Sequence, residues 1–350
     1  MKIWRTLKYI QYKVRSNWKS NYRYHGGLLA VIKSLLGRAK LKLLSRQLNS
    51  YSGVDVFTFS IVPALTSLSM HSLSKNGLSA VNHRIYVGDC SGGIRISGNK
   101  NRNLSVIPLL NEGHGKKLDL FTQFLAKGEF VLIWDDDVFC LDRVPIEWSL
   151  DQFNQNNQTA AVSLIPRYSF KWEINGEKHQ PMGSYCLMVR RSIWEKEHLP
   201  FRQLHQPSGN PKSYLGEYDT ADYANVELIK RGYQVVIAPN EIRKHLIVYK
   251  GVSSASLRVQ KHAGPGLPDY LRKVKKKDLK YLVAMGVLIK IHELEQENQF
   301  LNMYEHKDYM ITINRAYEIL ANELGENKVS EIEKKLDLDF RLIHKSLKGN

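Results

Sequence analysis

Short apolar runs alternate with amphipathic stretches through the first part of the chain. Four runs are rich in β-branched and aromatic residues, as strands buried on both faces are: residues 54–62, 82–87, 104–110 and 130–134. Residues 64–75, which end before Asn76 and Gly77, and residues 116–127 have the composition and spacing of helices. This order predicts an α/β fold, with a mainly parallel sheet and helices on both of its faces.

The alternation of apolar and polar positions continues in the second half of the chain. Residues 159–165 and 183–190 predict two further strands. An acidic segment, residues 216–223, leads into a predicted helix, and residues 234–238 form a last strand before Pro239. These elements extend the same α/β body.

Changes in composition divide the chain into four regions: a basic amphipathic arm at 1–50, the α/β body at 51–250, a Gly-, Ser- and Pro-rich mobile loop or plain linker at 251–269, and a helical region at 270–350. Three sets of apolar residues at helical spacing predict three helices in the last region. We expect these helices to dock on the body. Pairing of two copies of the chain through them and binding of a partner enzyme are the alternatives.

The charge of the chain is concentrated in the arm. The 350 residues carry a formal net charge of +17, and residues 1–50 hold twelve Lys or Arg and no Asp or Glu. Leucines recur at three- and four-residue spacing from Leu28, and Trp and Tyr are frequent before it, as on helices at an anionic membrane surface. The alternatives are docking of the leucines on the body and binding of nucleic acid, which the near-neutral body disfavours.

Other features bear on the compartment. Three cysteines, Cys90, Cys140 and Cys186, lack metal-ligand spacing and cannot form a framework of bridges, which fits a reducing compartment. The beginning of the sequence has no apolar segment typical of a secretory signal, and no run is long enough to span a bilayer. We therefore expect a cytoplasmic protein, attached peripherally to the inner face of the membrane.

The most informative polar feature follows the strand at 130–134, where Asp135, Asp136 and Asp137 come in succession. The carboxyl end of a strand in such a sheet is where chemistry is placed. Three adjacent carboxylates repel one another, and hard divalent cations prefer oxygen ligands. The sequence therefore predicts a cation site here; an exposed acidic turn is the alternative.

Together with the order of the predicted strands and helices, the three aspartates make residues 54–249 resemble a type-A-fold glycosyltransferase, similar to the inverting family 2 enzymes. The resemblance rests on a first strand that ends near Pro63, the Asp89-Cys90-Ser91 loop after the second strand, the Asn- and Gly-containing turn at 111–116, and the Asp-x-Asp motif at 135–137. The sequence departs from the family at Gly88, where a second acidic residue is often found.

The resemblance implies roles for particular residues. The nucleoside diphosphate sugar is expected to contact Pro63, Asp89, Ser91, Lys116, Asp135 and Asp136. A Mn²⁺ or Mg²⁺ ion is expected to be held chiefly by Asp137, with Asp135 and His245 as further ligands. In the family an acid before the late helix acts as general base, and here that acid is Asp222 or Asp219. We favour Asp222, although either aspartate also suits the start of a helix.

The function implied is metal-dependent, inverting transfer of a sugar to a hydroxyl of a glycan or lipid-linked glycan, in cell-surface polysaccharide synthesis. The donor is expected to be a nucleoside diphosphate sugar, UDP-linked by resemblance. Two rivals remain at this point. One is a nucleotidyl- or phosphoryl-transfer enzyme that uses the same aspartates, and the other is a non-enzymatic basic protein that binds nucleic acid or a membrane.

Overall fold

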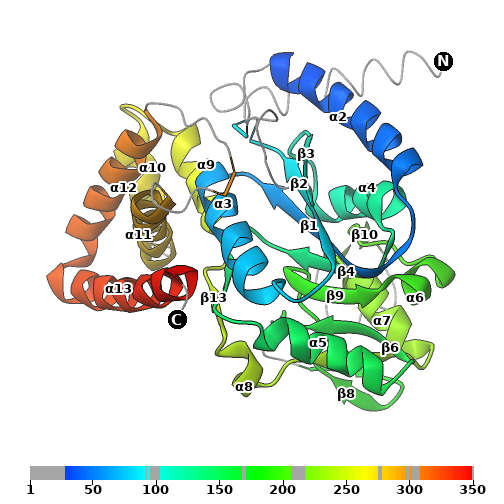
Figure 1. Ribbon diagram of the computed structural model, residues 1–350. Helices are drawn as coiled ribbons and strands as arrows, with labels where there is room; N and C mark the ends of the chain where they lie inside the picture. The colour runs from blue at the N-terminus through cyan, green and yellow to red at the C-terminus, as the bar shows by residue number, and fades with distance from the viewer. Residues whose placement is uncertain are drawn as a thin grey trace.

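A computed structural model describes residues 28–91, 93–94, 103–167, 171–205, 217–274, 278–295, 300–301 and 308–348. Its centre is a seven-stranded sheet in the order β12-β6-β9-β4-β1-β2-β3 (Figure 1). The strands are β1 (Tyr51–Ser60), β2 (His83–Asp89), β3 (Leu104–Pro108), β4 (Gly128–Trp134), β6 (Thr159–Ser163), β9 (Cys186–Arg190) and β12 (Gln234–Ile237). Strand β9 is antiparallel to both neighbours, and the other pairs are parallel. The predicted fold class is confirmed.

Helices cover both faces of this sheet. One face packs against α2 (Leu28–Gln47), α4 (His114–Leu125), α6 (Arg191–Lys196) and α7 (Asp222–Lys230). The other packs against α3 (Pro63–Ser72), its π-helical continuation η1 (Leu73–Gly77) and α5 (Val144–Gln155). Side chains of β4 alternate between the two cores, with Val131 and Ile133 in one and Leu132 and Trp134 in the other. This burial on both faces explains the uninterrupted apolar run.

Helix α2 confirms that the second half of the basic arm is helical; residues 1–27 lie outside the described residues. One side of α2 docks on β3, where a Cβ on Gly37 would come within 1.8 Å of the Pro108 carbonyl oxygen. Lys40 Nζ also donates to the Val106 carbonyl at 2.9 Å, and Leu41 is buried. The expected docking of this helix on the body is therefore present.

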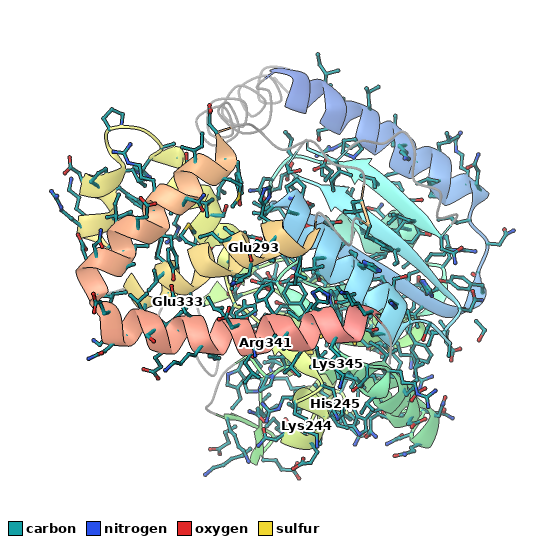
Figure 2. All side chains as sticks on the ribbon, turned by 60° about the vertical axis from the view of Figure 1, so that its left-hand side comes forward. Lys244, His245, Glu293, Glu333, Arg341 and Lys345 are labelled. Atoms are coloured by element: carbon teal, nitrogen blue, oxygen red, sulfur yellow. The ribbon has the colours of Figure 1, made fainter. Side chains whose placement is uncertain are left out.

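The C-terminal region forms the three expected helices, α11 (Asp278–Glu295), α12 (Tyr309–Leu324) and α13 (Glu326–Lys348). They share a core with Leu65 and Leu68 of α3, so they dock on the body. Figure 2 shows Glu293 on α11, and Arg341 and Lys345 along α13. Among the described residues no helix is long and apolar enough to cross a membrane.

The expectation of a loop at residues 251–269 is wrong, because this segment contains α9 (Val252–Lys261) and the start of α10 (Leu267–Lys273). Val252, Ala255 and Val259 recur at helical spacing and are buried against the C-terminal helices. The Gly and Ser residues suggested a loop. Gly251, with a φ of 81°, instead occupies the position directly before the first residue of α9. Packing of the apolar face decides the conformation.

Short elements complete the fold. A two-stranded antiparallel pair, β5 (Val138–Cys140) and β13 (Leu246–Val248), follows directly from the aspartates. The others are β7 (Trp172–Ile174) with β8 (Glu177–His179), β10 (Leu204–His205) with β11 (Glu217–Tyr218), and α8 (Asn240–Arg243). In the β5–β13 pair Val138 faces Val248, so Tyr249 lies beside Asp137 and the start of α9 comes close to the aspartates.

Candidate active site

The three aspartates form the turn between β4 and β5, at the carboxyl end of the central strand. The buried ring of Trp134 fixes the start of this turn, because its Nε1 donates to Ser69 Oγ at 3.1 Å and to the Val138 carbonyl at 3.0 Å. The Asp135 backbone N–H donates to the Tyr185 carbonyl on the neighbouring segment at 3.0 Å. The turn is therefore held on both sides.

The carboxylates have different surroundings. Ser253 Oγ donates to both oxygens of Asp136, at 2.8 and 2.7 Å, and the Gly251 backbone N–H donates to Asp137 Oδ2 at 2.7 Å. Both aspartates are buried, whereas the Asp135 side chain is 32% exposed. Asp136 and Asp137 thus hold the beginning of α9, and Asp135 faces the open side of the turn.

Burial and mutual repulsion act on this cluster. Burial raises the pKa of Asp136 to about 6, and burial with the neighbouring Asp136 charge raises the pKa of Asp137 to about 7. Burial and both neighbours raise the pKa of Asp135 well above its usual range. A nearby cation would relieve all three effects, and carboxylate oxygens are the donors that Mn²⁺ and Mg²⁺ take. The residues present therefore fit a hard divalent cation.

No group of three or more His, Cys, Asp or Glu that could hold a metal ion occurs among the described residues. That is compatible with Mg²⁺, which protein sites often hold through one or two carboxylates together with substrate phosphates. The cluster suits such a shared site better than a closed protein cage.

A buried lysine accompanies the cluster. Lys117 is 5% exposed, and its Nζ lies 3.3 Å from Cys90 Sγ and 4.7 Å from the centre of the Phe59 ring. Its charge partly opposes the rise in the pKa values of Asp135 and Asp136. The expected Lys116 is instead exposed at the surface of α4. The start of α4 at His114 decides that Lys117, and not the expected Lys116, points inward.

His114 stands beside the aspartates at the first position of α4. Its Nε2 lies 3.7 Å from Asp135 Oδ1, and its ring meets Phe59 edge-on. Burial and the Lys117 charge lower the pKa of His114 to about 3, so the imidazole is neutral at neutral pH. The sequence analysis assigned no role to His114, although it lies in the Asn- and Gly-containing turn at 111–116.

A second acidic group lies at the start of α7. Arg167 Nη2 pairs with Asp219 Oδ2, and Arg167 Nη1 lies 3.5 Å from Asp222 Oδ1. The Asp222 side chain is 4% exposed and its Oδ2 accepts from the Asp219 backbone N–H at 3.2 Å, whereas the Asp219 side chain is 45% exposed. The charge of Asp219 also acts on His114. Asp219 is thus the open carboxylate, and Asp222 the one that holds the helix start.

Hydrogen bonds and charge keep Asp219 ionised. Burial works against ionisation, but the Arg167 charge and hydrogen bonds from Gln203 and the Thr220 backbone hold the pKa of Asp219 below its usual range.

Lys250 lies on the same side of the molecule as the aspartates, with its Nζ 2.7 Å from Tyr185 Oη. The Asp137 charge raises the pKa of Lys250, but burial outweighs it and lowers that pKa overall.

The expected nucleoside residues lie at the ends of β1 and β2. Pro63 is the first residue of α3. Asp89 Oδ1 accepts from the Ser91 backbone N–H at 2.9 Å and from Ser91 Oγ at 2.5 Å, so these two residues shape their own loop. Residues 92 and 95–102 of this loop lie outside the described residues. The structure brings the ends of β1, β2 and β4 to one edge of the sheet, as predicted.

His245 is not brought to the aspartates. Its Nδ1 lies 2.5 Å from Asp142 Oδ2, and its carbonyl accepts from Leu141, at the far end of the β5–β13 pair from Asp137. Four residues along a strand span about 13 Å. The expected ligand set of Asp135, Asp137 and His245 is therefore not assembled, because the register of this pair places His245 beside Asp142.

No protein-family model and no curated protein matches the sequence. Among solved structures, the mannosyltransferase PcManGT from Pyrobaculum calidifontis, in complex with GDP-Man and Mn²⁺, is similar at 11% identity and a TM-score of 0.38, over 92% of this chain and 94% of that chain. S. aureus TarS is similar at 13% and 0.37, over 82% and 92%, and LgtC at 13% and 0.35, over 53% and 73%. The first of these proteins is a mannosyltransferase by name.

Proposed function

We propose that this protein is a metal-dependent glycosyltransferase that takes a sugar from a UDP-linked donor. The observation that carries the proposal is the cluster of Asp135, Asp136 and Asp137 at the carboxyl edge of a mainly parallel sheet, the last two of them buried, with raised pKa values and a buried lysine beside them. Such a cluster is costly without a cation. A nucleoside diphosphate brings the phosphate oxygens that would complete the cation's shell.

Asp135 and Asp137 would hold the Mn²⁺ or Mg²⁺ ion. When bound, the ion would supply charge neutralisation for the diphosphate that leaves. Lys117 adds fixed positive charge from the interior, and Lys250 adds it from the side of α9. Asp136 has a different task, because Ser253 occupies both of its oxygens and it positions the turn.

Asp219 is the carboxylate we propose as general base. It is ionised at neutral pH and open to the surface, and its charge acts on His114, which lies beside Asp135. It would take the proton from the acceptor hydroxyl as that oxygen attacks the anomeric carbon on the face opposite the diphosphate, which inverts the centre. Asp222 and Arg167 would orient it. This replaces our preference for Asp222, which is buried at the helix start.

The acceptor we propose is a hydroxyl of a glycan or lipid-linked glycan in cell-surface polysaccharide synthesis. Helix α2 supports attachment to a membrane surface, and we place the protein on the cytoplasmic face because sugar nucleotides are available there. Four apolar residues lie exposed on its undocked side, at helical spacing: Ile32, Leu35, Leu36 and Leu43. Arg38, Lys42 and Arg46 are exposed beside them, and residues 1–27 add seven Lys or Arg and no acid. Each such charge contributes about 1 kcal/mol at an anionic surface.

The test of this proposal is calorimetric binding of UDP, with and without Mn²⁺, to the wild type and to Asp137→Ala. We expect binding that needs Mn²⁺ and is lost in the variant, followed by transfer when UDP-sugars are screened with glycan acceptors. Binding of GDP, CDP or dTDP in place of UDP would change the donor but keep the reaction. Absence of binding by any of these nucleotides would overturn the proposal.

A further inference from the structure

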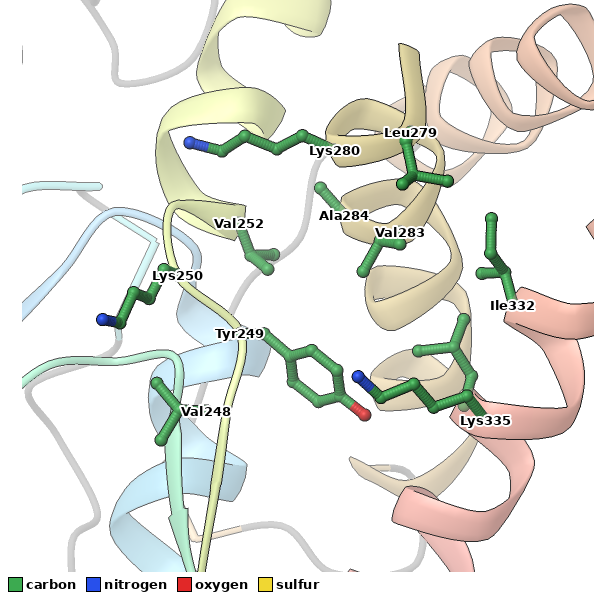
Figure 3. A pocket seen from close by; sticks show the side chains of 11 residues that line it. Val248, Tyr249, Lys250, Val252, Leu279, Lys280, Val283, Ala284, Ile332 and Lys335 are labelled. Atoms are coloured by element: carbon green, nitrogen blue, oxygen red, sulfur yellow. The ribbon is translucent and has the colours of Figure 1, made fainter. Parts of the chain in front are cut away.

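A pocket of about 310 Å³ lies between the segment that leads into α9 and the helices α11 and α13. Its walls are largely apolar, and Figure 3 shows Val252, Val283 and Ala284 turned toward one another, with the Tyr249 ring below them. The volume is at the lower end of that of small-molecule sites. Apart from Lys250, none of the residues that line it has a role in the proposed reaction.

Lys280 and Lys335 line this apolar pocket, and so does Lys250, whose Nζ points away from it and donates to Tyr185 Oη (Figure 3). Among the described residues that line it there is no carboxylate. Neither Lys280 nor Lys335 forms an ion pair with another residue in the part of the chain that the structure describes. The hydroxyl of Tyr249, which also lines the pocket, donates a 2.8 Å hydrogen bond to Asp339 on α13. A ligand that combines an apolar chain with an anionic group would match both the walls and the charges.

Apolar surface continues beyond the pocket. Leu279, which lines it, is 55% exposed. On α13, Leu338 comes three residues after Lys335, and Leu342 comes four residues after Leu338, so all three lie on the same side of the helix. Leu338 is 60% exposed and Leu342 is 43% exposed. An apolar chain longer than the pocket would therefore meet apolar side chains outside it.

We propose that this pocket binds a lipid that carries a phosphate headgroup, with the beginning of its hydrocarbon chain between α9, α11 and α13. A phosphate monoester has a charge of about −1.5 to −2 at neutral pH and several acceptor oxygens, so it suits the ammonium groups of Lys280 and Lys335 better than a single carboxylate does. The chain's own basic arm is a poor occupant, because residues 1–27 carry only positive charge and would meet lysines.

The inference does not depend on the proposed glycosyl transfer, because it concerns binding alone and can be tested without donor or acceptor. The probe is decyl phosphate below its critical micelle concentration, titrated calorimetrically into the full-length protein. Inorganic phosphate and decyl maltoside serve as probes of the charge and of the chain taken separately. The variants are Lys280→Glu with Lys335→Glu, and the matched control is Lys334→Glu, an exposed lysine of α13 that does not line the pocket.

We expect saturable binding of decyl phosphate, weakened about tenfold or more in the double variant and unchanged in Lys334→Glu. Both partial probes should bind at least about tenfold more weakly than decyl phosphate. Equal binding of inorganic phosphate would overturn the proposal in favour of a free-phosphate site, and equal binding of decyl maltoside would leave the lysines without a role. Unchanged binding in the double variant, or no saturable binding at all, would also overturn it. Unfolding midpoints of the variants show whether each is folded.

Discussion

Asp137 accepts a 2.7 Å hydrogen bond from the backbone N–H of Gly251, a residue 114 positions later in the chain. Gly251 has a φ of 81°, and a Cβ there would lie 2.8 Å from Lys280 Nζ. Gly251→Ala should therefore lower the free energy of unfolding by about 1–2 kcal/mol and weaken Mn²⁺-dependent UDP binding, because the N–H that positions Asp137 would shift. Thermal unfolding and calorimetry measure the two effects.

Gly232→Ala is the matched control for this variant. Gly232 has the same φ of 81°, open space where a Cβ would be, and a position at the end of α7. Its replacement should lower stability by a similar amount and leave UDP binding unchanged. If both variants bind UDP as the wild type does, the link between Gly251 and Asp137 has no part in nucleotide binding.

The two late aspartates should respond differently to substitution by asparagine. Asp219→Asn should lower kcat by about 10²–10⁴-fold, because the general base is lost, and change stability by less than about 1 kcal/mol. Asp222→Asn should lower the free energy of unfolding by about 1–3 kcal/mol, because Asp222 is buried beside Arg167. Transfer assays and denaturant unfolding separate the effects. A normal kcat in Asp219→Asn would exclude it as the base.

Adjacent lysines allow a paired test of the interior charge. Lys117→Met should weaken UDP binding about tenfold or more, because Lys117 is the buried cation beside Asp135 and Asp136. Lys116→Met removes the same charge from the surface of α4 and should change the affinity less than about twofold. Calorimetry at two salt concentrations measures both. Equal losses would point to a long-range effect of net charge.

The raised pKa values of Asp136 and Asp137 predict the pH dependence of stability without metal. Because they lie at about 6 and 7, the folded protein holds protons that the unfolded chain, with an ordinary pKa of about 3.9, has released. The contribution of this cluster to stability therefore increases as pH falls from about 7 toward about 4. Mn²⁺ should raise the unfolding midpoint at pH 8 and much less at pH 5.5, since protons compete with it.

The control for this pH dependence is the double variant Asp136→Asn with Asp137→Asn, which cannot release these protons. In a chelator its unfolding midpoint should vary less between pH 5.5 and pH 8 than that of the wild type. A wild-type midpoint that falls with decreasing pH as steeply as that of the double variant would show that other groups govern the dependence.

The exposed side of α2 should govern attachment to lipid. Leu36→Glu places a negative charge on the apolar stripe, and we expect binding to vesicles that contain phosphatidylserine to fall about tenfold or more, because apolar burial is lost and repulsion is added. Ile311→Glu, an equally exposed apolar position on α12, is the control and should leave binding unchanged. Vesicle sedimentation measures it. Equal effects of the two variants would remove α2 as the contact.

The sequence predicted the strands of the sheet well because burial on both faces requires continuous apolar runs, as in β4. It also predicted the position of the aspartates, since the run ends where they begin. The antiparallel insertion of β9 between β4 and β6 could not be predicted, because residues 186–190 look the same in either direction. Strand direction is set by contacts between distant segments.

The positions of side chains that differ from the sequence prediction depend on register and packing. A shift of one residue in the start of α4 decides between Lys116 and Lys117, and helix boundaries are the least certain feature of a sequence pattern. His245 lies six residues after Pro239, as the resemblance required, yet the pairing of β13 with β5 directs it to Asp142. Arg167 gave no signal at all, because it meets Asp219 and Asp222 only in the folded protein.

The dependence of Asp136 and Asp137 on Ser253 and Gly251 has a consequence for the order in which the protein matures during synthesis. All seven strands of the sheet lie between residues 51 and 237, so the sheet can assemble on the ribosome before the later residues emerge. At that stage the two carboxylates lack the hydrogen bonds from Gly251 and Ser253, so they remain hydrated or protonated. The protein would therefore bind a nucleotide only after α9 has been synthesised. A chain terminated before α9 would be partly folded but unable to bind nucleotide.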